Sequence, residues 1–186
     1  EQKAQDALFN AGVFREGLGQ YKVALKNREK YLELWPKSKD AEAVEKSIID
    51  LQEKMGTWKK VLDGLEAYEK KNTKDPNKIL ITEGRIATIY EEKLKNQKLA
   101  RGVYERIWKY YEQLSKKQKE ALEIQALDAV ARSSFLQNED DWKKYSGIKL
   151  KWSKLQNIGE LKSSIKVKGE ALADVQKAYT RTVALK

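Results

Sequence analysis

The sequence contains neither cysteine nor histidine among its 186 residues. Without cysteine it can form neither disulfides nor thiolate metal sites, and without histidine it lacks the commonest transition-metal ligand. The usual base at neutral pH is also missing, which excludes catalytic triads and activated thiols. Prolines are equally scarce, since Pro36 and Pro76 are the only two. Few helix breakers therefore interrupt the chain.

Long apolar runs are missing as well. No stretch approaches the eighteen or so residues that cross a bilayer, and the N-terminal residues lack the apolar core of a signal peptide. We therefore expect no direct contact with a membrane. Because the first residue is Glu1, any targeting segment upstream is not visible. The compartment stays open, with a bacterial periplasm preferred over the cytoplasm.

The residues that are present favour helix. The chain is 35% charged and rich in Ala, Leu, Glu, Lys and Gln, which lose little freedom in a helix. Acidic pairs occur at Glu91-Glu92 and Asp140-Asp141, but neighbours on a helix point about 100° apart and cannot flank one bond. Phosphate-binding glycine loops and calcium-binding spacings are also absent. We therefore expect no catalytic residue, no cofactor and no metal.

The first organised stretch, residues 4–36, predicts two helices joined by a tight turn. Apolar and small residues recur at intervals of three and four on both sides of the turn. They are Leu8, Ala11, Gly12 and Phe14 in the first segment, and Tyr21, Ala24, Leu25, Tyr31 and Leu32 in the second. The turn is expected at Gly17-Leu18-Gly19. Pro36 ends the second helix, because proline disfavours helical geometry in the residue before it.

A second pair of helices is predicted over residues 40–73. Its turn, Gly56-Thr57-Trp58, repeats the pattern of Gly19-Gln20-Tyr21 after 37 residues. A third pair is predicted over 78–114, with a connection near Lys95-Asn96-Gln97 that contains no glycine. The recurrence of a turn followed by an aromatic residue favours helical repeats over an ordinary bundle.

The C-terminal part predicts a fourth hairpin over 118–154 and a last helix over 159–185. The fourth hairpin is expected to turn at Asn138-Glu139-Asp140, just before Trp142. The last helix has an apolar stripe with no partner helix after it. Its members are Leu161, Ile165, Leu172, Val175, Tyr179 and Val183. Since a solenoid normally closes with a polar capping helix, we expect the array to continue beyond this segment.

The first hairpin resembles the tetratricopeptide repeat (TPR) family. The likeness is carried by Ala11-Gly12, Gly19, Tyr21, Ala24 and Leu34-Trp35-Pro36. These stand at the spacing of the family's small-residue, turn, aromatic, alanine and terminal-proline signature. The sequence departs from the pattern at Arg15, Arg28 and Tyr31. These departures predict a looser hairpin, and the chain resembles a degenerate TPR array of the bacterial type.

The resemblance implies an all-α fold, namely a right-handed α-solenoid of about four antiparallel hairpins followed by a C-terminal helix. Residues 1–186 would then form a single TPR-like domain. In this family the first helices of successive hairpins line a concave groove that holds a peptide or a protein segment. The resemblance therefore implies a non-catalytic scaffold for protein–protein interaction.

The resemblance also indicates which residues face that groove. They are Phe9, Val13 and Glu16 in the first unit, Lys46, Asp50 and Glu53 in the second, Arg85, Ile89 and Glu92 in the third, and Val130, Ser134 and Gln137 in the fourth. Phe9 and Val13 occupy positions where some members have a carboxylate clamp, which argues against such a clamp. The mixed surface suits a partner segment with one apolar face and some acidic residues.

Two other functions stay open. The segment could be a structural spacer within a larger envelope or assembly protein. The net charge of +10 rises toward the C-terminal part, so nucleic-acid binding there is a further alternative, ranked last. Trp108 with Tyr111, and Trp142 with Tyr145, stand three residues apart, so we expect both pairs to pack inward rather than stack on bases.

Overall fold

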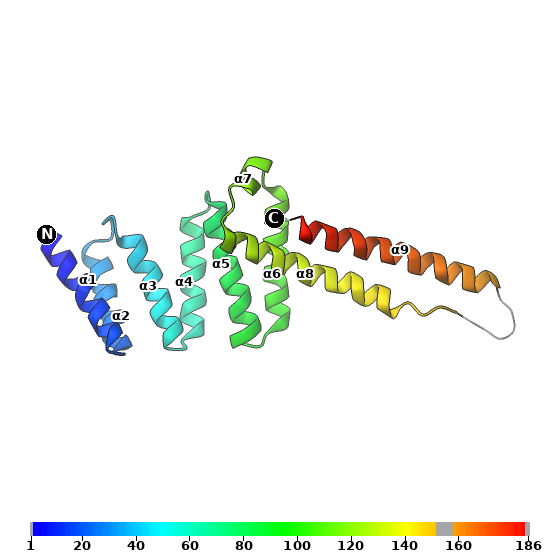
Figure 1. The fold of residues 1–186 in the computed structure, drawn as a ribbon. Coiled ribbons are helices and arrows are strands. Elements are labelled where there is room, and N and C mark those ends of the chain that lie inside the picture. Colours follow the sequence, from blue (N-terminus) through cyan, green and yellow to red (C-terminus); the bar gives the residue numbers. More distant parts are fainter. Residues whose placement is uncertain (1, 152–157, 185–186) are drawn as a thin grey trace. The chain divides into compact units, whose positions relative to one another are not determined.

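The structure, a computed structural model, describes residues 2–151 and 158–184. Every regular element within those residues is a helix, which confirms the prediction of an all-α chain. The helices form two compact units, residues 1–73 and 74–186 (Figure 1). No helix in the described ranges is both long enough and apolar enough to cross a bilayer.

The first unit contains four helices of similar length. They are α1 (Gln2–Gly17), α2 (Tyr21–Leu34), α3 (Ala41–Lys54) and α4 (Trp58–Lys71). Helix α2 packs against both α1 and α3, and α3 packs against α4. These elements agree with the first two predicted hairpins, because the local signals of periodicity, glycine and proline all point to the same boundaries.

The two glycine turns of this unit have the same backbone structure. Gly19 and Gly56 both have a left-handed φ, +71° and +69°, which glycine adopts without a steric penalty. In both turns the following N–H reaches back five residues: Gln20 donates to the Arg15 carbonyl at 2.8 Å and Thr57 to the Gln52 carbonyl at 3.0 Å. The repeat of 37 residues seen in the sequence is thus a repeat of turn geometry.

The core of the first unit lies mainly on α2, α3 and α4. Its buried apolar side chains are Ala24, Tyr31, Val44, Ile49, Leu51, Val61, Leu62, Leu65 and Tyr68. Helix α1 contributes less. Gly12 is buried against α2, and Phe9 meets the edge of the Tyr31 ring at a centroid distance of 6.3 Å.

The second unit is built on three helices that contact one another, α5 (Pro76–Thr88), α6 (Gln97–Gln113) and α8 (Ile124–Gly147). Helix α5 continues into a π-helical turn, η1 (Ile89–Lys93), and the short α7 (Lys116–Glu120) precedes α8. Asp75 caps α5 by accepting the N–H groups of Asn77 and Lys78. Helix α9 (Ile158–Val183) packs along α8.

The third predicted connection is present without glycine. Lys95 adopts the left-handed φ of 53° that glycine supplies in the first two turns. Asn96 then caps α6 by accepting the Leu99 N–H, and its own N–H donates to the Tyr90 carbonyl at 2.7 Å. The π-helical turn and the cap hold this connection in place of a glycine.

The predicted turn at Asn138-Glu139-Asp140 is wrong. Helix α8 runs through these residues without a break, so the fourth hairpin over 118–154 is not formed as expected. Asn138 is buried and donates to the Thr182 hydroxyl of α9 at 2.8 Å, while Asp140 accepts from Arg101. These polar side chains bind neighbouring helices rather than the local backbone. Trp152, expected in the second helix of that hairpin, lies outside the described residues.

The last helix therefore does have a partner, and it is the preceding one. Along α9, Val175 is buried and Leu161 is half-buried, whereas Ile165 and Leu172 remain exposed. The single stripe predicted from the sequence is divided between two faces of the helix.

Two glycines in helix interiors should have opposite effects on stability when each is replaced by alanine. A Cβ on Gly84 of α5 would lie 2.8 Å from the Ala129 Cβ of α8, whereas a Cβ on Gly102 of α6 would meet nothing within 4 Å. We predict that Gly84→Ala destabilises the chain by about 1–2 kcal/mol, because overpacking outweighs the gain in helix propensity.

In the same background, Gly102→Ala should stabilise the chain by about 0.5–1 kcal/mol. Urea denaturation followed by circular dichroism measures both changes. Equal stabilisation by the two alanines would contradict the close contact between α5 and α8.

Candidate peptide-binding groove

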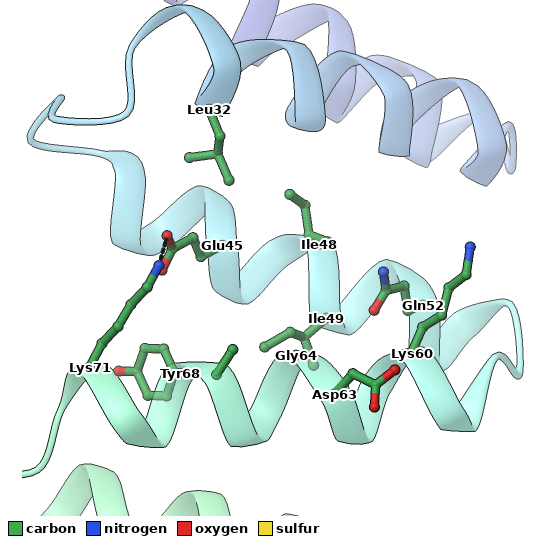
Figure 2. Close-up of a pocket in the computed structure, with 11 residues that line it drawn as sticks. Leu32, Glu45, Ile48, Ile49, Gln52, Lys60, Asp63, Gly64, Tyr68 and Lys71 are labelled. Atoms are coloured by element: carbon green, nitrogen blue, oxygen red, sulfur yellow. Dashed lines mark hydrogen bonds and ion pairs between the residues drawn. The ribbon is translucent and has the colours of Figure 1, made fainter.

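A groove of about 410 Å³ lies between α2, α3 and α4 of the first unit (Figure 2). Its apolar lining comes from all three helices and consists of Leu32, Ile48, Ile49, Ala67 and the ring of Tyr68. The volume is within the ~300–1,000 Å³ range of sites that take small ligands or side chains. The groove therefore offers an apolar recess in a chain whose surface is mostly charged.

The local sequence explains why the recess forms. Gln52 follows Ile48 by four residues and Ile49 by three, so it shares a face of α3 with each of them, and the three side chains lie within about 100° of one another. Opposite them α4 presents Gly64, whose missing side chain lets Ile49 approach: a Cβ there would lie 3.0 Å from the Ile49 Cγ1. Small residues on α4 leave room that the larger side chains of α3 do not fill.

Polar side chains stand around the groove. Lys71 of α4 pairs with Glu45 of α3 at one end. Gln52, Lys60 and Asp63 stand toward the other end (Figure 2). Lys60 is exposed and has no ion-pair partner among the described residues. An apolar floor with polar side chains at both ends is the usual composition of a site that binds a peptide side chain.

The structure places the predicted groove residues of α3 on another face. Lys46, Asp50 and Glu53 lie about a third of a turn around α3 from Ile48 and Gln52. Lys46 is engaged locally, since its ammonium lies 3.4 Å from the Glu42 carboxylate and 5.2 Å from the centre of the Tyr68 ring.

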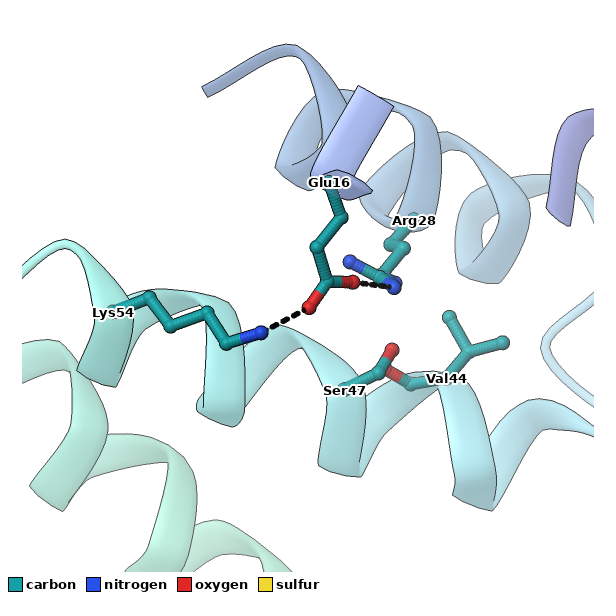
Figure 3. A network of polar contacts seen from close by, with 5 residues as sticks. All are labelled: Glu16, Arg28, Val44, Ser47 and Lys54. Atoms are coloured by element: carbon teal, nitrogen blue, oxygen red, sulfur yellow. Dashed lines mark hydrogen bonds and ion pairs between the residues drawn. The ribbon is translucent and has the colours of Figure 1, made fainter. Parts of the chain in front are cut away.

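On α1, the predicted residues Phe9, Val13 and Glu16 have three different roles. Phe9 packs against Tyr31 of α2, and Val13 is exposed. Glu16 joins three helices (Figure 3). It accepts from Arg28 of α2 and, at 2.6 Å, from Lys54 of α3. Glu16 is thus occupied by intramolecular ion pairs.

Arg28 explains why Glu16 is held so firmly. The arginine is 5% exposed, and two of its nitrogens, Nε and Nη1, have no hydrogen-bond partner among the described residues. Its third nitrogen, Nη2, donates to Glu16. The hydrogen bond from Lys54 is the largest influence on Glu16 and, with Arg28, lowers the pKa of its carboxyl group against the opposing effect of burial.

The remaining predicted residues belong to the second unit. Ile89 is 4% exposed, so its side chain lies in the core and does not line an open surface. Arg85 is partly buried, and Glu92 is exposed with its carboxylate 3.7 Å from Arg132. Of the fourth-unit positions, Val130 and Ser134 are buried and Gln137 is half-buried. The groove of α2, α3 and α4 was not found by sequence reasoning.

A second cavity, of about 520 Å³, lies between α6 and α8. Three of its lining residues are cations, namely Lys98, Arg101 and Lys143. Arg101 is paired with Asp140 at 2.8 Å, and Lys143 lies 3.8 Å from Glu139. Its charges are largely compensated within the protein, so this cavity has no clear preference for an ion.

Other polar contacts of the second unit also hold helices together. Arg106 of α6 binds the buried Glu83 of α5 through two hydrogen bonds, of 3.0 and 2.8 Å. Glu91 accepts from both Tyr104 and Arg132, and burial, followed by this hydrogen bond, raises the pKa of Tyr104. In the described part of the chain no three acidic side chains are grouped so that they could hold a metal ion.

Both aromatic pairs are present, but they differ in burial. Trp108 and Tyr111 are partly buried, with ring centres 5.7 Å apart. Trp142 is nearly half exposed although it contacts Tyr145, so the expectation that it packs inward is wrong. The reason is that α9 covers the Tyr145 side of α8 and leaves the Trp142 side uncovered.

Comparison with known proteins adds no relative. No family model matches the chain, and no curated protein or solved structure is detectably similar to it.

The Glu16 network predicts a pH-dependent contribution to stability. Because the folded state lowers the pKa of Glu16 from its ordinary value of 4.5, this contribution is present above that pH and disappears as the pH falls through the lowered value. We predict that Glu16→Gln destabilises the chain by about 1–3 kcal/mol at neutral pH, because it leaves Arg28 buried without a carboxylate.

The matched control is Glu33→Gln, since Glu33 forms an exposed pair with Lys30. We expect it to change stability by about 0.5 kcal/mol or less. Urea titrations across the acidic range should show the difference between wild type and Glu16→Gln shrinking below pH 4.5. A difference that stays constant would contradict the lowered pKa.

Proposed function

We propose that this chain is a non-catalytic scaffold that binds a segment of another protein, and that the segment sits in the α2–α3–α4 groove. The observation that supports the proposal is the apolar recess of about 410 Å³ between Leu32, Ile48 and Ala67. A recess of this size loses contact with water when apolar side chains enter it, which stabilises the complex.

The partner's chemistry follows from the lining. Apolar side chains of the segment contact Ile48 and Ile49, and an acidic residue beside them meets Lys60, which has no ion-pair partner in the described ranges. The Gln52 amide, which can both donate and accept, is available to the peptide backbone. This resembles the way apolar anchors fix a peptide while polar groups set its orientation.

The composition supports a binding role over a catalytic one. The chain has no histidine and no cysteine, which are the most frequent bases and thiol nucleophiles of enzymes. The shared turn geometry at Gly19 and Gly56 also supports repeated hairpins in the first unit, as expected of a TPR-like scaffold.

Two alanines allow a matched test of where the segment binds. Ala67 of α4 lines the groove and is exposed, while Ala43 is an exposed residue of α3 that precedes Lys46 by three and Asp50 by seven residues. Ala43 thus lies on the surface that the sequence predicted. The same substitution can be placed at both sites.

We predict that Ala67→Glu weakens binding of library-selected peptides roughly tenfold or more, because it places a charge in the apolar recess. Peptides are selected from a random library displayed on phage against the whole chain, then synthesised and measured by fluorescence anisotropy. Ala43→Glu should change the affinity by about twofold or less. Failure to select any peptide, or a greater loss with Ala43→Glu, would contradict binding in this groove.

A further inference from the structure

Helices α8 and α9 form an antiparallel pair that we call the arm, comprising residues 134–151 and 158–183 (Figure 1). Three contacts fix its register. The hydroxyl groups of Ser134 and Thr182 lie 2.6 Å apart, Lys168 donates to the Ile148 carbonyl at 2.8 Å, and the Lys151 N–H donates to Ser164 at 3.2 Å. The two helices therefore run side by side, and residues 148–151, which follow the end of α8, continue along α9 as far as Ser164.

The inner residues of α9 follow a coiled-coil pattern. Apart from Tyr179, the buried and half-buried ones are Leu161, Ser164, Lys168, Ala171, Val175, Ala178 and Thr182. Their spacing alternates strictly between three and four residues, as at the a and d positions of a heptad. On α8 the matching positions are Ser134, Asn138, Asp141 and Tyr145, and Ile148 follows at the same spacing just after the helix ends. The seam between the two helices is thus rich in small and polar residues.

The largest apolar side chains lie beside this seam, at the e positions of the heptads. They are Phe135 and Trp142 on α8, and Ile158, Ile165, Leu172 and Tyr179 on α9. In an antiparallel pair the e positions of both helices fall on the same side. The edge-on contact of Phe135 and Tyr179, with ring centres 6.4 Å apart, agrees with this assignment. We call these six residues the apolar side of the arm.

The opposite side of the arm, at the g positions, is polar. Its residues are Gln137, Lys144, Lys151, Glu160, Val167, Asp174 and Arg181. Five of the seven are charged, and Val167 is the single apolar one among them. Most of the large apolar side chains of the arm therefore lie on one side, with Leu150, Val167 and Val183 as the exposed exceptions. On that side Ile158, Ile165, Leu172 and Tyr179 repeat every seven residues along about three heptads. A third helix has the period and the width to cover them.

The charges are mostly positive in the part of the arm that is farthest from Ser134 and Thr182. Within 142–151 and 158–168 the arm has seven lysines and a single acidic residue, Glu160. Lys149 follows the end of α8, between Ile148 and Lys151, whose contacts with Lys168 and Ser164 place it beside the stretch of α9 that contains Ile165. Lys162 lies between Ile158 and Ile165 on the same face of α9. Neither lysine has an ion-pair partner in the described part of the chain. A partner with acidic residues next to its apolar stripe would pair with both.

We propose that the apolar side of the arm binds an amphipathic helix of another protein, with apolar a and d residues and acidic flanks, to complete a three-helix bundle. A second copy of the arm would place the same lysines opposite one another, so like charges disfavour it. The site belongs to the second unit and is independent of the α2–α3–α4 groove.

The test uses the whole chain and three synthetic helical peptides of about four heptads each. The first has Leu at its a and d positions and Glu at the flanking positions. The second replaces Glu by Lys, and the third replaces Leu by Gln. Fluorescence anisotropy should show binding of the first peptide alone, and added salt should weaken it.

The matched variants compare the two sides of the arm. Ile165 is 51% exposed on the apolar side and Val167 is 49% exposed on the polar side, so neither change removes a core residue. The pair Ile165→Gln and Leu172→Gln should weaken peptide binding roughly tenfold or more, and Val167→Gln about twofold or less. The pair Lys149→Glu and Lys162→Glu should instead favour the Lys peptide.

Several outcomes would overturn the proposal. The Glu and Lys peptides could bind equally well, or no peptide could bind at all. Val167→Gln could also lower the peptide affinity as much as the Ile165→Gln and Leu172→Gln pair does. Sedimentation of the free chain as a dimer that Ile165→Gln and Leu172→Gln dissociate would assign the apolar side to a second copy. Binding to phosphatidylglycerol vesicles that the same pair abolishes would assign it to a lipid surface.

Discussion

Both units depend on pairs of helices that approach each other closely at glycine. Gly84 lets α5 reach Ala129 of α8, and Gly64 lets α4 reach Ile49 of α3. In the first unit the same contact determines how deep the groove is, because it places Ile49 in the floor. In the second unit it fixes the helix from which the arm extends. Neither surface could keep its shape if these helices moved apart.

Charged residues also join one helix to the next. Glu16, Glu83 and Glu91 each accept hydrogen bonds from cations on other helices. This leaves little unpaired charge near the places where those helices cross. On the arm, Lys143 and Lys144 are paired with Glu139 and Asp141, whereas Lys149 and Lys162 have no ion-pair partner among the described residues. The charged residues that join helices are thus different from the lysines that are available to a partner.

Sequence reasoning found the elements whose signals are local. Glycine and proline marked the ends of α1, α2 and α3, whereas the third pair was predicted to start at residue 78 and α5 begins at Pro76. It failed where a residue's role depends on a distant helix. Asn138 looks like a turn residue, yet it binds Thr182. The groove was missed because Ile48 and Gly64 read as ordinary core and helix residues. The spacing of seven residues between Ile158, Ile165 and Leu172 is visible in the sequence. It identifies them as a second apolar face of α9 only once the alignment of α9 with α8 is known.

Helix α8 belongs to two structures at once. Its first half packs in the core of the second unit, and its second half forms one side of the arm. Twenty-four residues of unbroken helix make a rod about 36 Å long. A force applied at the C-terminal end of α8 therefore acts at a long distance from the buried residues Ala126, Ala129 and Val130, so it exerts a large torque on their contacts. Such a force also acts on the contacts of Ser134 and Asn138 with Thr182 that join α9 to α8.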